Sequence, residues 1–527
     1  MANFPNALKM DLRQHLQEMQ HGARGDSFGR TTVLSNREQL HRLRTNGPVL
    51  AQQLDELAVS AATRFRECLD RLSPQAALSL TLPILQRAPI LRHCGFDTLM
   101  WLIAAGGRGD SHERRLMIEA TQLFGAWVGA TTLRAHFDYD PLVPVEASRI
   151  QSAEGVRRAF GLETRMAWTT EMICLELSRQ VQAEREFAKE LPELTPVAVT
   201  AAMSYSRNLS MLDLPWGRQR PNRTATSLLA QLAVPIKHSE RLNPVEALSL
   251  GLMEQYPVVT IDGEPYPMAM KSMLFGLELP LFDLVRGRLG GSALGELYER
   301  TVRACIKNTA PPGLEVEGPV HVHPPIRDNR LETDFVLLSR GRVAVVGECK
   351  GLLPSTSAPG VVAALGQDLR KALRQVELRV GRAKQGSTFT RRGGAPLQPS
   401  SHIIGLVTPL HGYGSAAWDG TALEMAMEGA ANVLPLASLL LALSLMISER
   451  DFVRYMHWRH AQMSRRLVGL DELEYLLGYL SSNSVGHVTD ITVLRAYTLP
   501  SEFAITQQPL SNRQHWRELL YNSSTPA

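Results

Sequence analysis

The chain has 527 residues, of which 44% are hydrophobic and 20% charged. This length exceeds one ordinary domain and is typical of a folded protein with about two to four modules. The formal net charge is only +4, so the overall charge balance argues neither for nor against a polyanionic partner. The five cysteines show no Cys-x-x-Cys spacing, which excludes a recognisable zinc module and argues against a disulfide framework.

These features favour a cytoplasmic protein. The first residues contain no basic start followed by an apolar core, so no secretory signal is expected. The longest apolar run, residues 433–447, falls short of the roughly 20 residues that cross a membrane. We expect this run to form a buried helix.

Residues 1–286 form a mainly helical N-terminal region, within which two subdomains are conceivable. Apolar residues recur at a spacing of three or four through residue 205, beginning with Leu8 and Leu12. Helix starts are expected at Ser73-Pro74, Thr195-Pro196 and Asn243-Pro244. The glycine-rich segment 106–110 lacks a following Gly-Lys-Ser/Thr and is predicted to be a connector between helices.

Two further regions follow in the predicted organisation. In residues 287–412, loops rich in Pro and Gly alternate with β-branched runs, which predicts a mixed α/β core. Its first glycines, from Gly287 to Gly295, are expected to precede a helix. Helical periodicity then returns in residues 413–527, through 424–446 and 451–479. The predicted fold class is therefore α+β or α/β, with a mixed-sheet core between large helical regions.

The most informative stretch of this core is a predicted hairpin, residues 332–351, whose open end is charged. Alternate residues of a strand share a face, so Glu348 and Lys350 are neighbours. Asp334, on the first strand, reaches that face only if the loop has an odd number of residues, such as Ser339-Arg340-Gly341. A loop of two residues would place Asp334 on the opposite face.

Two carboxylates at the end of an apolar hairpin repel each other unless a cation lies between them, and oxygen ligands of this kind suit Mg²⁺. Lys350 adds a compact positive charge beside them. Only eight of the 56 basic residues are lysine, so a lysine at this place favours a specific role.

The order of these elements resembles the restriction-endonuclease-like PD-(D/E)xK nuclease superfamily over about residues 288–412. A helix carrying Gly295-Glu-Leu-Tyr-Glu299, an Asp-bearing strand, a turn, a strand ending in Glu-x-Lys, a helix with Gln375 and a strand over 402–409 follow one another. The full motif of this family has a Pro before the Asp, and this sequence has none before Asp334. The resemblance implies that Glu299, Asp334 and Glu348 hold one or two Mg²⁺ ions, for which Mn²⁺ substitutes. It also implies catalytic roles for Asp334, Glu348, Lys350 and Gln375.

Basic residues near these carboxylates indicate contact with nucleic acid. The segment 367–394 has a local charge balance of +6, and its candidates for phosphate contact are Lys371, Arg374, Arg379 and Arg382. A solvated helix face explains the same charges and stays open. A second basic segment, residues 450–466, contains Tyr455 and Trp458, for which packing against the core is expected rather than base stacking.

The sequence thus predicts a metal-dependent nuclease that hydrolyses phosphodiester bonds. DNA is favoured over RNA, and an endonuclease in bacterial defence or repair is the expected context. The helical N-terminal region would offer a surface for protein partners, and no membrane association is expected. The alternative is a non-catalytic nucleic-acid-binding or assembly subunit built on a nuclease fold.

Overall fold

The computed structural model describes most of the chain, in separate stretches, and divides it into two compact units. The described residues are 47–80, 84, 96–138, 166–210, 221–235, 242–249, 251–323, 332–351, 353, 364–391, 394–410, 431–464, 472–482, 513–514 and 517–518. Unit 1 contains Met1–Tyr139, Thr200–Gly276 and Arg495–Ser501, and unit 2 contains Asp140–Val199, Leu277–Leu494 and Glu502–Ala527. Residues 287 and 412, where we expected boundaries, both lie within unit 2.

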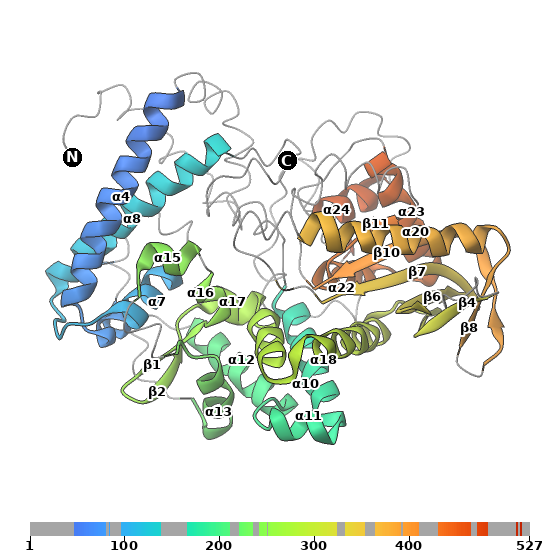
Figure 1. Ribbon diagram of the computed structural model, residues 1–527, viewed down its shortest axis with the longest axis horizontal. Coiled ribbons are helices and arrows are strands. Elements are labelled where there is room, and N and C mark those ends of the chain that lie inside the picture. The colour runs from blue at the N-terminus through green and yellow to red at the C-terminus, as the bar shows by residue number, and fades with distance from the viewer. Residues whose placement is uncertain are drawn as a thin grey trace. The chain divides into compact units, whose positions relative to one another are not determined.

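Unit 1 is mainly helical, in agreement with the apolar periodicity of the sequence. Its two longest described helices, α4 (Gly47–Arg71) and α8 (Arg114–Asp138), lie side by side (Figure 1). Phe65 of α4 packs against Phe124 and Trp127 of α8, with ring centroids 5.5 and 6.1 Å apart. The shorter helices and one hairpin are α7 (Phe96–Gly106), α12 (Pro196–Ser210, shared between the units), α13 (Arg223–Gln231), α15 (Pro244–Ser249), α16 (Leu252–Gln255), α17 (Met270–Phe275), β1 (Val258–Ile261) and β2 (Glu264–Pro267).

The predicted helix starts are confirmed where the structure describes them. Thr195 Oγ1 accepts a hydrogen bond from the N–H of Ala198 (3.1 Å) before α12, and Asn243 Oδ1 accepts one from Val245 (3.1 Å) at the start of α15. Ser73 caps a 3-10 helix, Pro74–Ser79, rather than an α-helix. Residues 107–113 connect α7 to α8, as predicted. The helix expected around Leu8 and Leu12 lies outside the described residues.

Unit 2 is built around a five-stranded mixed sheet. Its strands are β3 (Leu314–Glu317), β6 (Phe335–Ser339), β7 (Arg342–Lys350), β10 (Pro399–Pro409) and β11 (Ala431–Val433), and they lie side by side in this order. β3, β6 and β7 are successively antiparallel, whereas β10 runs parallel to β7 and β11 parallel to β10. The parallel step from β7 to β10 requires a crossover, which α20 (Arg370–Lys384) provides.

Helices cover both faces of this sheet. α18 (Glu278–Thr309) and α20 lie on opposite sides of β7 and β10 (Figure 1). On the α18 side, Tyr298 donates a hydrogen bond from its hydroxyl to the carbonyl of Thr408 (3.1 Å), and a Cβ added at Gly351 would lie 3.3 Å from its ring. Two further helices of unit 2, α10 (Ala167–Ala183) and α11 (Arg185–Glu190), contact α18.

A smaller antiparallel sheet branches off beside the end of β6. Its strands are β5 (Glu332–Thr333), β4 (Val320–His323), β8 (Thr388–Arg391) and β9 (Pro396–Leu397), in that order. The chain passes directly from β5 to β6 through Asp334. Asp334 therefore lies at the bend between the two sheets.

Two sequence predictions about element boundaries are wrong. The glycines from Gly287 to Gly295 lie within α18 rather than before a helix, and Gly290, with φ +86°, kinks that helix. Within the stretch 424–446 that was expected to be one helix, Ala431–Val433 forms the edge strand β11, and the described helix is α22 (Leu436–Leu445). Residues 424–430 lie outside the described part of the chain.

The C-terminal helices complete unit 2. Every residue of α22 is buried, as expected for this apolar run, and no helix in the described stretches is long and apolar enough to cross a bilayer. α23 (Glu449–Ser464) and α24 (Glu472–Ser482) follow within the predicted helical segment. The mixed-sheet core flanked by helices, predicted from the sequence, is confirmed at this level.

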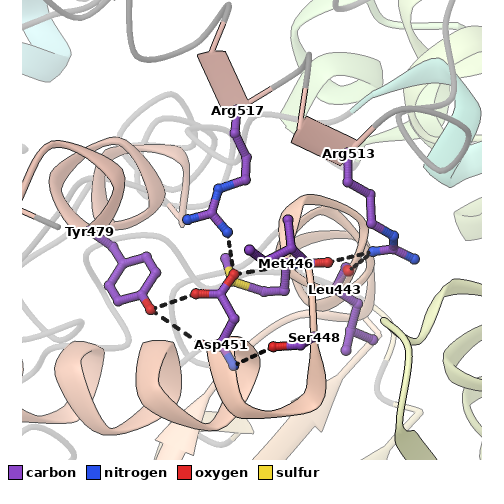
Figure 2. Close-up of polar contacts among 8 residues, drawn as sticks. Leu443, Met446, Ser448, Asp451, Tyr479, Arg513 and Arg517 are labelled. Atoms are coloured by element: carbon purple, nitrogen blue, oxygen red, sulfur yellow. Dashed lines mark hydrogen bonds and ion pairs between the residues drawn. The ribbon is translucent and has the colours of Figure 1, made fainter. Parts of the chain in front are cut away.

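Two arginines near the C-terminus attach to these helices (Figure 2). Arg513 donates hydrogen bonds to the carbonyls of Leu443 and Met446 at the end of α22, and also to those of Thr309 (2.9 Å) and Ala310 (3.2 Å) at the end of α18. Arg517 pairs with Asp451. Carbonyls at helix C-termini lack partners within their own helix, so a guanidinium satisfies them well.

Candidate active site at the end of the central hairpin

The hairpin turn differs from the predicted one, yet the predicted clustering is confirmed. Ser339 pairs with Arg342, so the loop has two residues, Arg340 and Gly341, with φ of +53° and +71°. Such a loop alone would place Asp334 on the face of the hairpin opposite to that of Glu348 and Lys350. The ladder shifts by one residue between Leu337 and Leu338, however, because Ala344 forms a bulge in β7. The bulge restores the register in which Asp334 lies opposite Glu348.

The carboxylate of Asp334 closes the end of the β6–β7 ladder. Phe335 pairs with Gly347 as the last pair of the ladder, so the next N–H of β7 that points toward β6, that of Cys349, has no residue of β6 opposite it. Asp334 Oδ2 accepts this N–H at 2.6 Å. A buried N–H without a partner is costly, and the side chain satisfies it here. Among the described residues, Asp334 Oδ1 has no hydrogen-bond partner.

Glu348 lies deepest in the site and contacts two cations. Only 4% of its surface is exposed. Its Oε1 lies 2.9 Å from Lys350 Nζ, and its Oε2 pairs with Arg379 Nη1 of α20. A buried carboxylate is costly unless it is paired and hydrogen-bonded. Lys350 and Arg379 supply these partners to Glu348.

Glu299 approaches from α18, on the helix face that also carries Arg303. Arg303 Nη1 lies 3.7 Å from Glu299 Oε2 and donates a hydrogen bond to the backbone carbonyl of Asp334 (3.0 Å). The Glu299 side chain remains 36% exposed. Arg303 thus links α18 to the bend that carries Asp334, while Glu299 lies at the rim.

The three carboxylates influence one another electrostatically. Burial, the charge of Glu348 and the charge of Glu299 raise the pKa of Asp334 to about 7, against the opposing effects of the Cys349 N–H and Lys350. Burial also raises the pKa of Glu299, while Arg303 lowers it and Glu348 raises it. The pKa of the Cys349 thiol is raised because it is buried beside Asp334. A further positive charge near Asp334 would relieve this repulsion.

The donor set suits a divalent cation only in part. Within the stretches that the structure describes, no three His, Cys, Asp or Glu side chains are grouped so that they could hold a metal ion, so the predicted triad with Glu299 is not assembled. Mg²⁺ is usually held by one or two carboxylates together with water and substrate phosphate. Asp334 and Glu348 meet this smaller requirement, because Asp334 Oδ1 has no hydrogen-bond partner among the described residues.

Helix α20 carries the predicted residues of the site, and one of them, Arg379, has a role that the sequence did not indicate. Gln375 is half-buried, and its Oε1 is enclosed without a hydrogen-bond partner. Lys371 and Arg374 are exposed and Arg382 half-exposed, so all three remain candidates for phosphate contact. Arg379 is only 5% exposed and pairs with Glu348. Its predicted contact with phosphate is therefore wrong, because its guanidinium is turned into the site.

The remaining candidates are Glu332 and residues of α23. Glu332 is exposed, and its charge contributes to the raised pKa of Glu299. In α23, Tyr455 is fully buried and donates a hydrogen bond to Glu472, with which Arg459 also pairs. These contacts confirm that this helix packs into the core. Arg465 and Arg466 lie outside the described residues.

No protein-family model, curated protein or solved structure matches this chain.

Proposed function

We propose that this protein is a metal-dependent nuclease that hydrolyses phosphodiester bonds in DNA, with its site at the end of strands β6 and β7. The observation that carries the proposal is that the Asp334 carboxylate accepts the N–H of Cys349, the residue after Glu348, while Lys350 contacts Glu348. The order of α18, β6, β7, α20 and β10 also follows the order expected from the resemblance to PD-(D/E)xK nucleases.

Each residue has a role that its surroundings support. Asp334 and Glu348 would hold a divalent cation, which when bound supplies stabilisation of phosphoryl oxygens and lowers the pKa of water. The ammonium group of Lys350 orients the attacking water or stabilises charge on the phosphoryl group. Gln375 supports the site through its enclosed amide, and Lys371, Arg374 and Arg382 hold the phosphate backbone.

A second function, binding nucleic acid without cleavage, is favoured by one specific observation. Glu348 already contacts two cations, Lys350 and Arg379, so part of the cluster is balanced without a metal ion. A subunit that only grips nucleic acid would keep such a cluster for its structure. It would use the exposed basic residues of α20 for binding.

One experiment separates the two functions. Purified protein is incubated with plasmid, linear duplex, single-stranded DNA and RNA, in Mg²⁺, in Mn²⁺ and in EDTA. The nuclease predicts cleavage that EDTA abolishes and that Asp334→Asn lacks. Binding of the same substrates with no cleavage in any metal, at protein in excess of substrate, would refute the nuclease and support the binding subunit.

A further inference from the structure

Arg379 is the residue whose place in the site no sequence pattern explains. It comes from α20, on the face of the sheet opposite α18, and reaches a carboxylate of β7 that lies 31 positions earlier in the chain. Its side chain is 7% exposed, and that of Glu348 is 6% exposed. The pair is therefore shielded from solvent, and charges interact strongly in such surroundings.

Basic side chains already contact this site without any metal ion. Arg303 lies near Glu299, whereas Lys350 and Arg379 both pair with Glu348. One divalent cation adds two positive charges to this arrangement, and two divalent cations together add four. Like charges a few ångströms apart repel each other strongly where water is excluded.

The oxygen atoms lead to the same conclusion. A second metal ion would need carboxylate oxygens that are not already engaged by other partners. Glu348 offers Oε1 to Lys350 and Oε2 to Arg379, and Asp334 Oδ2 accepts the N–H of Cys349. The oxygen of this pair that has no partner among the described residues is Asp334 Oδ1.

We propose that Arg379 takes the place of a second cation, so that the site accepts a single divalent ion and binds it weakly. Arg379 fixes the Glu348 carboxylate through Oε2 and repels further positive charge from that side. It is a positioning residue, because it acts through Glu348. This proposal rests on the proposed nuclease function and deepens it, since it specifies how many ions the site takes.

Arg379→Gln tests the proposal, with Arg379→Lys and Arg374→Gln as matched controls. Arg374 lies on the same helix but is exposed, so its replacement removes an equal charge without touching Glu348. Binding of Mn²⁺ to metal-free protein is measured by titration calorimetry and by the electron paramagnetic resonance of free Mn²⁺. Circular dichroism selects the variants that retain the native fold.

We expect the wild type to bind one Mn²⁺ at the site, and Asp334→Asn to lose that ion. Arg379→Gln should bind Mn²⁺ at least tenfold more tightly, because a neighbouring positive charge is gone, while both controls stay within about threefold of the wild type. A residue that merely supports the fold would give unchanged or weaker binding.

Three outcomes would overturn the proposal. Binding of two ions that both require Asp334 would show that Arg379 does not take a cation's place. Unchanged or weakened binding by folded Arg379→Gln would show the same, and if that variant fails to fold, the wild-type stoichiometry still decides. Absence of any Mn²⁺ binding by the wild type, with or without DNA, would instead remove the metal-dependent nuclease itself.

Discussion

Asp334, immediately before β6, lies beside Glu348 of β7 because β7 carries one extra residue, Ala344, which shifts the register of the β6–β7 ladder. A two-residue turn alone would place Asp334 and Glu348 on opposite faces of the hairpin. The extra residue in β7 shifts the register by one and returns them to the same face. Two carboxylates placed side by side in this way disfavour each other's charge, which contributes to the raised pKa of Asp334. A hairpin selected for stability alone would avoid this pair, so its presence favours a functional role.

The first prediction concerns this pair. Asp334→Asn should abolish metal-dependent cleavage, since the neutral amide is a poor ligand for Mg²⁺. It should leave folding intact, because the amide oxygen can still accept the N–H of Cys349. Cleavage of plasmid DNA and thermal unfolding are measured together. Glu299→Gln, at the rim, should lose less activity, and excess Mn²⁺ should restore part of it.

Full activity of Asp334→Asn would contradict the site assignment. Glu348→Ala is a poorer test, because Glu348 is buried between Lys350 and Arg379. Its removal would leave two cations without their partner, so loss of activity would not separate chemistry from folding.

The hairpin shows how far the sequence could go. Alternation of side chains predicted that Glu348 and Lys350 are neighbours, and glycine at position 341 predicted the turn. A bulge has no such signature here, since Ala344 stands in a run of similar small and β-branched residues. The sequence therefore predicted the cluster correctly but attributed it to a three-residue loop, whereas a two-residue loop and a bulge produce it.

Arg379 shows what the sequence could not provide. Helical spacing places Lys371, Arg379 and Arg382 on one stripe of α20, and all three were candidates for phosphate contact. Which edge of that stripe turns inward depends on how α20 lies against β7, a tertiary contact between distant segments. The one available signal is that Arg379 borders the apolar stripe containing Val376 and Val380.

The second prediction concerns pH. The pKa of Asp334 is about 7 in the folded protein and about 3.9 in an unfolded chain. The folded state therefore holds the proton more tightly, and this contribution to stability is fully present below about pH 4 and is lost as the pH rises through 7. In EDTA, the stability of the wild type relative to Asp334→Asn should fall by a few kcal/mol at most across this range.

Urea unfolding of both proteins at intervals of half a pH unit checks this expectation. Because only the difference between the two proteins is compared, titration of other groups cancels. A constant difference from pH 4 to pH 8 would show that Asp334 keeps an ordinary pKa. Addition of Mg²⁺ at pH 8 should reduce the difference by stabilising the wild type.

The third prediction concerns the stability that Arg379 provides. Arg379→Ala leaves the buried carboxylate of Glu348 with one cation instead of two, and losses of about 3–5 kcal/mol are usual when a buried ion pair is broken. Arg374→Ala, four residues before Leu378 on the exposed side of the same helix, should change stability by about 0.5 kcal/mol or less. Equal unfolding midpoints for the two variants would contradict the buried pair.

The fourth prediction concerns the C-terminal attachment of unit 2. Arg513→Ala removes hydrogen bonds to four carbonyls at the ends of α18 and α22, and should cost about 1–3 kcal/mol. Gln514→Ala is the control, because Gln514 is exposed and its amide donates a hydrogen bond to the exposed Glu518 (2.9 Å). Hydrogen exchange should show faster exchange at the C-terminal turns of both helices in Arg513→Ala. No change there would mean that the contact does not hold them.

The last prediction concerns how α20 holds DNA. Lys371, Arg374 and Arg382 lie along one side of this helix and are exposed or half-exposed. If all three contact phosphates, binding releases counterions, and the logarithm of affinity falls by about 0.9 per contact for each unit of log salt. Replacing the three by Gln should flatten this slope by roughly 2.7.

Affinity is measured for two unrelated duplexes across a salt series, in the Asp334→Asn background so that nothing is cut. The loss should be nearly equal for both duplexes, because phosphates carry no base identity. Gln keeps helix propensity close to that of Lys and Arg, so a change in slope would not reflect unfolding of α20. Arg379 is left intact because it faces Glu348. An unchanged slope would mean that these charges form a solvated helix face and that DNA is held elsewhere.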